Sequence, residues 1–146
     1  MNAIPEGPIL DIYNTTKDFL RVSDLFIAGE IALQQEQWPQ AARLLEEAAA
    51  IEDELGYGEP PMWLQPVRHT LGAVHLKQGR HADAERVYRA DLEKWPDNGW
   101  SLYGLARALE EQGKADEARE VRAAYERAWK KAGEPIRTSC KCIPVT

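Results

Sequence analysis

Apolar and small residues recur along most of the chain at the spacing of α-helices, in segments that proline and glycine separate. One segment, about residues 66 to 78, begins with Pro66, whose missing N–H suits a first helical turn. Gly79 follows it and suits a helix end, because glycine readily adopts the left-handed conformation. A second segment, about residues 82 to 94, stops at the turn 96–99. The pattern predicts short helices joined by tight turns.

The second half of the chain repeats itself at an offset of 34 residues, as from 79 to 113. The aligned residues are mostly small or apolar: Leu71 with Leu105, Gln78 with Gln112, Gly79 with Gly113, Ala84 with Ala118, Val87 with Val121, Ala90 with Ala124 and Trp95 with Trp129. The helices of the later copy are expected at about residues 100 to 112 and 116 to 131. Small residues at a fixed period indicate helix pairs that stack closely.

An earlier copy is visible when a spacer is allowed. Gly29 aligns with Gly72 and Ala41 with Ala84, an offset of 43 residues, so 43 − 34 = 9 residues are added between the first and second copies. We therefore divide the chain into an N-terminal segment 1–21, repeats 22–55, 65–98 and 99–132, an inserted loop 56–64 within this array, and a tail 133–146. The N-terminal segment is interpreted as a partial helix that caps the array, or as the remnant of a further repeat.

This pattern resembles the tetratricopeptide repeat family. The second copy carries the family's residues at the expected spacings: Leu71, Gly72, Gly79, Ala84, Tyr88 and Pro96. It departs from the family with Arg68, His75 and Asp91, and in the third copy Arg122 replaces an aromatic residue. The resemblance covers about residues 22 to 132. It implies an all-α fold, a right-handed superhelix of antiparallel helix pairs with about three repeats.

The resemblance further implies that the first helix of each pair lines a concave groove. The groove residues that it assigns are Phe26, Glu30, Leu33, His69, Ala73, Trp100, Tyr103, Arg107 and Glu110. Phe26 and Leu33 would serve equally well as packing between helices, whereas leucines already fill the packing positions around Trp100 and Tyr103. Aromatic side chains beside an arginine are typical of interaction hot spots. We therefore predict a non-catalytic scaffold that binds a peptide or protein segment.

One known ligand class of this family is not expected. Repeats that hold the C-terminal carboxylate of chaperones use Lys, Asn and Arg side chains on these helices, and here only Arg107 matches.

The inserted loop is rich in large apolar residues for a connection. Tyr57, Met62 and Trp63 are expected at the rim of the groove, either as ligand contacts or as a plug between two repeats.

The charge of the chain argues against two classes of partner. The chain has 18 basic and 24 acidic residues, a net charge of −6, and no basic stripe, so nucleic acid and anionic membrane are not expected as partners. No apolar run has the length of a membrane span, and the N-terminus lacks the pattern of a signal peptide. Two cysteines do not form a disulfide framework, which favours a reducing compartment and a cytoplasmic location.

Catalytic motifs are not found in the sequence. No serine lies in G-x-S-x-G, and His69 and His75 are spaced for different faces of a helix rather than for one metal ion. We therefore expect neither an enzyme nor a cofactor.

The tail leaves alternatives open. The first is a flexible tail in which Cys140 and Cys142 have no specific role. The second is a soft-metal site for copper or zinc, or a redox role, because two thiols one residue apart can chelate a soft ion. The apolar end, residues 143–145, would suit packing over the last helix. A further alternative is homo-oligomerisation through uncapped repeat ends.

Overall fold

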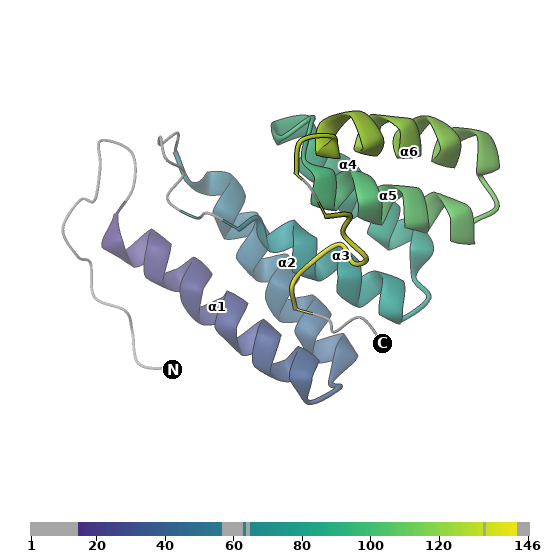
Figure 1. The fold of residues 1–146 in the computed structure, drawn as a ribbon. Coiled ribbons are helices and arrows are strands. Elements are labelled where there is room, and N and C mark those ends of the chain that lie inside the picture. Colours follow the sequence, from purple (N-terminus) through teal and green to yellow (C-terminus); the bar gives the residue numbers. More distant parts are fainter. Residues whose placement is uncertain (1–14, 57–62, 64, 133, 143–146) are drawn as a thin grey trace. The chain divides into compact units, whose positions relative to one another are not determined.

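The structure, a computed structural model, describes residues 15–56, 63, 65–132 and 134–142. Six α-helices lie within these residues: α1 (Thr16–Gln34), α2 (Trp38–Glu54), α3 (Val67–Lys77), α4 (His81–Lys94), α5 (Gly99–Glu111) and α6 (Ala115–Trp129). They belong to two compact units, residues 1–67 and 68–146 (Figure 1). The predicted all-α helical-repeat fold is confirmed.

Unit 1 contains the helix pair α1 and α2. Their core is formed by buried side chains that include Val22, Leu25 and Leu45. Gly29 brings the helices close together, since a Cβ atom at this position would lie 2.8 Å from Leu45 Cγ.

The start of α1 differs from the predicted boundary at residue 22. Thr15 caps the helix: its hydroxyl accepts a hydrogen bond from the Asp18 N–H, and its own N–H donates to the Asp18 carboxylate. Residues 16–21 therefore continue the first helix of the first pair rather than forming a separate segment. The remainder of the predicted N-terminal segment lies outside the described residues.

Unit 2 contains α3 to α6, and its core is centred on Tyr88, Leu105 and Leu109. In this unit α4 packs against α5, and α5 against α6. Asn98 is the N-cap of α5, and its side-chain oxygen accepts hydrogen bonds from the N–H groups of Trp100 and Ser101.

The turn within each helix pair uses the left-handed backbone conformation. Gly79 and Gly113 have φ angles of 70° and 74°. The corresponding position in the first pair is Glu36, whose φ is 58° although it is not glycine. The three pairs thus share one turn geometry, and the glycine signal for it is missing from the first pair.

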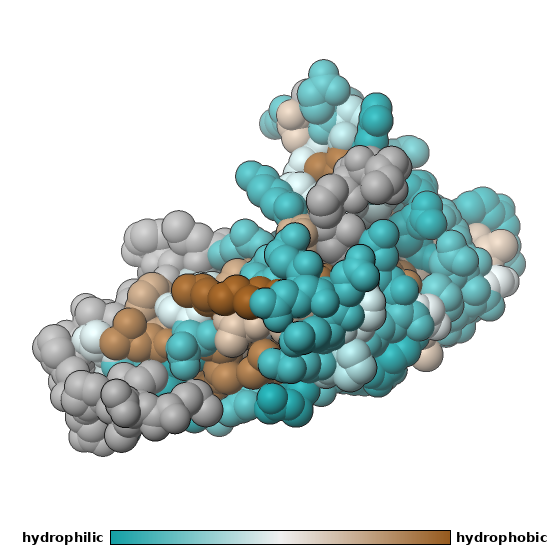
Figure 2. Space-filling view, turned by 90° about the horizontal axis from the view of Figure 1, so that it is seen from below, coloured by the Kyte–Doolittle hydropathy of each residue, from teal (hydrophilic) through white to brown (hydrophobic). Residues whose placement is uncertain are grey.

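Apolar side chains are exposed on α1: Leu20, Ile27 and Ile31. The face of the molecule drawn in Figure 2 is mainly hydrophilic, with apolar atoms on part of it. Of the helices in the described part of the chain, none combines the length and the apolar composition that a membrane span requires.

Candidate functional site

Four aromatic side chains of unit 2 form a continuous surface, here called the aromatic face. It consists of Trp100 and Tyr103 from α5 with Tyr125 and Trp129 from α6. Trp100 meets Trp129 edge-on at 5.9 Å between ring centroids, and Tyr103 meets Tyr125 at 5.8 Å. Tyr125 and Trp129 lie one helical turn apart and stack at 6.1 Å. Offset and edge-on contacts of this kind favour a rigid surface.

The tail continues after α6 (Figure 1), and its residues 134–137 are hydrogen-bonded to this aromatic face. Aromatic side chains make three hydrogen bonds with the tail's main chain: Trp129 Nε1–H donates to the Glu134 carbonyl (2.8 Å), Tyr103 Oη–H donates to the Arg137 carbonyl (3.0 Å) and the Ile136 N–H donates to Tyr125 Oη (3.2 Å). The face therefore holds a chain segment through its backbone, which the interpretation of residues 134–142 as a flexible tail did not predict.

Beyond Arg137 the tail reaches a buried position. Ser139 and Cys140 are 3% and 1% exposed, and Ser139 Oγ lies 2.5 Å from the hydroxyl group of Tyr88. Burial raises the pKa of Tyr88 above its ordinary range, so the group is a neutral hydroxyl. Tyr88 itself is fully buried.

Tyr88 belongs to α4 but is positioned by glycines of two other helices. A Cβ atom at Gly72 of α3 or at Gly104 of α5 would overlap the Tyr88 ring. These glycines therefore leave a slot through which the ring extends, and its hydroxyl meets the tail at the end of the slot.

Charged side chains lie beside the aromatic face. Arg107 is exposed and pairs with Glu110 and Glu111 along α5. Arg122 of α6 pairs with Glu110 and lies over the Tyr103 ring at 5.7 Å from its centroid. The predicted groove residues Arg107 and Glu110 thus form a charged edge next to Tyr103.

A polar network that sequence reasoning missed lies inside unit 2. Ser101 Oγ donates to Asp91 Oδ2 at 2.5 Å, and both side chains are buried. His69 Nε2 lies 3.4 Å from the same carboxylate oxygen and 2.9 Å from Asn98 Nδ2. Because the serine hydroxyl faces a carboxylate rather than an imidazole, the geometry is that of a link between α3, α4 and α5, not that of a serine nucleophile.

Three of the predicted groove residues are buried in the structure. Leu33 in unit 1 and His69 and Ala73 in unit 2 are 4%, 5% and 3% exposed, so they offer little surface to a ligand. Sequence reasoning could not separate these positions from Trp100 and Tyr103, because all of them share one helical period.

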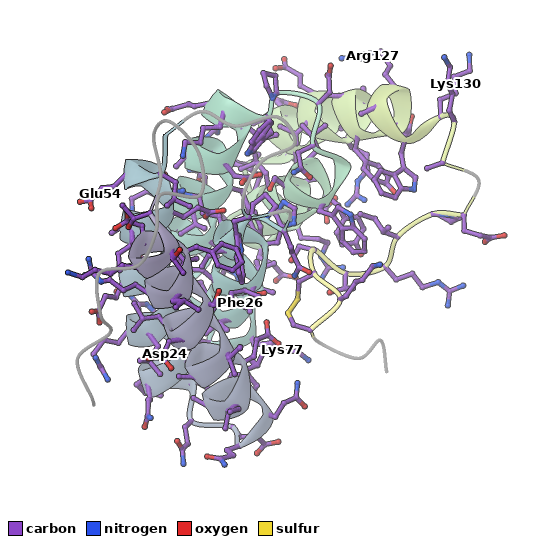
Figure 3. The ribbon with its side chains drawn as sticks, turned by 90° about the vertical axis from the view of Figure 1, so that its left-hand side faces the viewer. Asp24, Phe26, Glu54, Lys77, Arg127 and Lys130 are labelled. Carbon is purple, nitrogen blue, oxygen red and sulfur yellow. A yellow bond between two sulfur atoms is a disulfide. The ribbon has the colours of Figure 1, made fainter. Side chains whose placement is uncertain are left out.

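In unit 1 Trp63 of the inserted loop contacts Phe26, one of the predicted groove residues. Trp63 lies 5.3 Å from Phe26 and 5.8 Å from Phe19, measured between ring centroids, and Phe26 is labelled in Figure 3. Trp63 therefore packs against α1 within unit 1. Glu30 is half-buried on α1. Tyr57 and Met62, the other predicted rim residues, lie outside the described residues.

The two cysteines are joined as a disulfide, drawn in yellow in Figure 3. The expectation of free thiols differs from this state, and a disulfide leaves no thiolate to bind copper or zinc. The soft-metal alternative at Cys140 and Cys142 therefore concerns the reduced chain alone, where it stays a prediction. Among the residues that the structure describes, no group of three or more His, Cys, Asp or Glu side chains is arranged to hold a metal ion.

Comparisons with known proteins agree with the helix pairs of unit 2. The family model of the tetratricopeptide repeat matches residues 75–131, which include α4, α5 and α6. No curated protein matches the chain. Tetratricopeptide repeats serve in general as scaffolds for protein–protein interaction. The repeated turn geometry and the close helix contacts at glycine agree with this match, and together they support a tetratricopeptide repeat protein.

Proposed function

We propose that this chain is a non-catalytic interaction scaffold whose aromatic face binds an extended peptide or protein segment of a partner. The observation that carries the proposal is the tail on this face, held by hydrogen bonds from Tyr103 and Trp129 to backbone carbonyl groups. A surface that binds one extended segment through its backbone can accept another of different sequence. Rigid aromatic side chains also lose little conformational entropy on binding.

The charged edge supports the same function. Arg107 and Glu110 are exposed beside Tyr103, so a bound segment would meet both signs of charge within one helical turn. Such contacts contribute more to the choice of partner than to affinity.

The proposal does not extend the binding surface to unit 1. Phe26 contacts Trp63 there, and Leu33 is buried, so neither is assigned to the partner.

Self-association is the second candidate. The observation that favours it is the same docked tail, because a segment that binds its own unit can also bind that unit in a second copy. Light scattering over a concentration series tests this candidate: an exchange of tails gives dimers or longer assemblies, and a monomer at every concentration would contradict it.

The scaffold proposal is tested with peptides selected from a random library on the immobilised full chain. Tyr103→Phe removes the hydroxyl that donates to a backbone carbonyl and should weaken selected peptides about fivefold, and Trp100→Ala should weaken them more. Glu120→Ala, an exposed change on the opposite side of α6, is the control. Peptides that bind all four proteins equally would contradict the assignment of the aromatic face.

A further inference from the structure

We propose that the aromatic face selects segments that carry a serine or threonine hydroxyl, and that the Tyr88 hydroxyl recognises this group through a hydrogen bond. The inference rests on the proposed function and names the chemistry of its partner. The tail, with Ser139 against Tyr88, is then a tethered copy of the ligand.

Tyr88 places a hydroxyl group beneath the docked tail. Its ring is fully buried between Gly72 and Gly104, and its hydroxyl meets Ser139 of the tail. The ring alone accounts for the packing, which a phenylalanine would provide equally well. The hydroxyl adds a polar atom at the base of the binding surface, which needs a hydrogen-bond partner.

A partner segment must take the place of the tail before it can contact Tyr88. When a partner segment replaces it, Tyr88 again becomes covered, and water is excluded from its hydroxyl. A segment with an apolar residue opposite Tyr88 would leave that hydroxyl buried without a partner, which is costly. A hydroxyl side chain restores the bond that Ser139 makes. Selection thus arises mainly from rejection of the wrong segment.

The tail is bound through its backbone at one end and through a side chain at Ser139. At Glu134, Ile136 and Arg137 the aromatic face contacts backbone atoms, which every residue carries except the N–H of proline. The Arg137 side chain is exposed. At Ser139 a side chain supplies the hydrogen bond, and the following residue, Cys140, is small and buried. The expected ligand is therefore an extended segment with a hydroxyl residue followed by a small residue.

The test uses two synthetic peptides of residues 134–142 in the disulfide form, one with the natural sequence and one with Ser139→Ala. Each is titrated to millimolar concentration against the full chain carrying Ser139→Ala, whose own tail docks less tightly. This tail competes equally with both peptides, so the ratio of their affinities is preserved. The serine peptide should bind about tenfold more tightly than the alanine peptide.

The matched protein control adds Tyr88→Phe, which keeps the ring and removes the hydroxyl. On this chain the tenfold ratio should fall to near one, because the two changes belong to one interaction. Equal affinities on the tyrosine chain, or a ratio that persists on the phenylalanine chain, would overturn the hydroxyl selection and leave peptide binding intact. If neither peptide binds, the proposed function fails as well. Because the serine–alanine contrast lies in the peptides, both are compared on the same protein, and a difference in folding cannot produce the ratio.

Discussion

The hydroxyl group of Tyr88 lies 2.5 Å from Ser139 Oγ, although 51 residues separate them in sequence. Tyr88 is a core residue of the repeat, whereas Ser139 belongs to the tail that follows the last helix. This hydrogen bond therefore connects the core of the helical repeat with the docked tail.

Tyr88→Phe should loosen the tail while the helices remain folded. The change removes a buried hydrogen bond of the tail, about 1 kcal/mol, and leaves the ring between its two glycines. Limited trypsin digestion, followed by mass spectrometry, should show faster cleavage after Arg137 and Lys141. Glu120→Gln on the exposed side of α6 is the control and should digest like the unmodified chain. Unchanged cleavage in Tyr88→Phe would mean that this bond does not hold the tail.

Gly104→Ala should destabilise unit 2 by about 2 kcal/mol, because the added methyl group overlaps the Tyr88 ring in a closely packed core. Chemical denaturation measures the free energy of unfolding. The same change in a Tyr88→Ala background, where the ring is absent, should cost much less. Equal costs in the two backgrounds would show that the glycine is needed for a reason other than the close approach of Tyr88.

Reduction of the disulfide by an excess of a dithiol should release the tail. Reduction opens the ring that joins Cys140 to Cys142, so the undocked tail gains conformational freedom that docking must remove. Trypsin cleavage after Arg137, which lies outside the disulfide ring, should become faster, and the double change Cys140→Ser, Cys142→Ser should show fast cleavage there with and without the reductant. If trypsin cleaves the oxidised and reduced chains at the same rate, docking of the tail does not depend on the disulfide.

Acid should weaken the contact between α4 and the turn that follows α5. Burial acts to raise the pKa of Glu85, but hydrogen bonds from Lys114, Gln112 and Arg89 outweigh it and lower the pKa to about 2, from an ordinary value of 4.5. The folded state therefore favours the carboxylate, and this stabilisation is complete above the ordinary value and is lost as the pH falls towards 2. Glu85→Gln should remove about 2 kcal/mol of this pH dependence, since its partners are partly exposed.

The control for the acid prediction is Glu117→Gln. Glu117 also pairs with Arg89 but is largely exposed, so its removal should change the pH dependence little. The measurement is the free energy of unfolding by urea at several values between pH 5 and pH 2. A Glu85→Gln curve parallel to that of the unmodified chain would contradict the account.

The helix pairs were predictable from the sequence because their contacts repeat. Gly79 and Gly113 predict two of the turns, and small residues that recur every 34 positions predict the close packing of the helices. Glu36 adopts the same turn conformation without the glycine signal. The start of α1 was missed, although Thr15 and Asp18 have the spacing of a capping box.

The candidate site was less predictable because its contacts follow no period. Trp100 and Tyr103 were identified from their helical positions, but the tail docks through backbone atoms, which leave no pattern in the sequence. The pair Asp91 and Ser101 joins two different helices, and each residue alone looks like a departure from the repeat. Such cross-helix hydrogen bonds need three-dimensional information.

The most direct test of the account is an NMR titration of the full chain labelled with 15N, to which an unlabelled peptide of residues 134–142 is added. The tethered tail has an effective concentration in the millimolar range, so the peptide is needed at several millimolar. The account predicts that the amide signals of Ile136 to Lys141 move to the positions of an unfolded segment as the peptide replaces the tail, while the signals of α5 and the Trp129 indole stay near their docked positions. Tail signals that are already unfolded without peptide, or that do not move when peptide is added, would contradict the claim that the aromatic face is a site for extended segments.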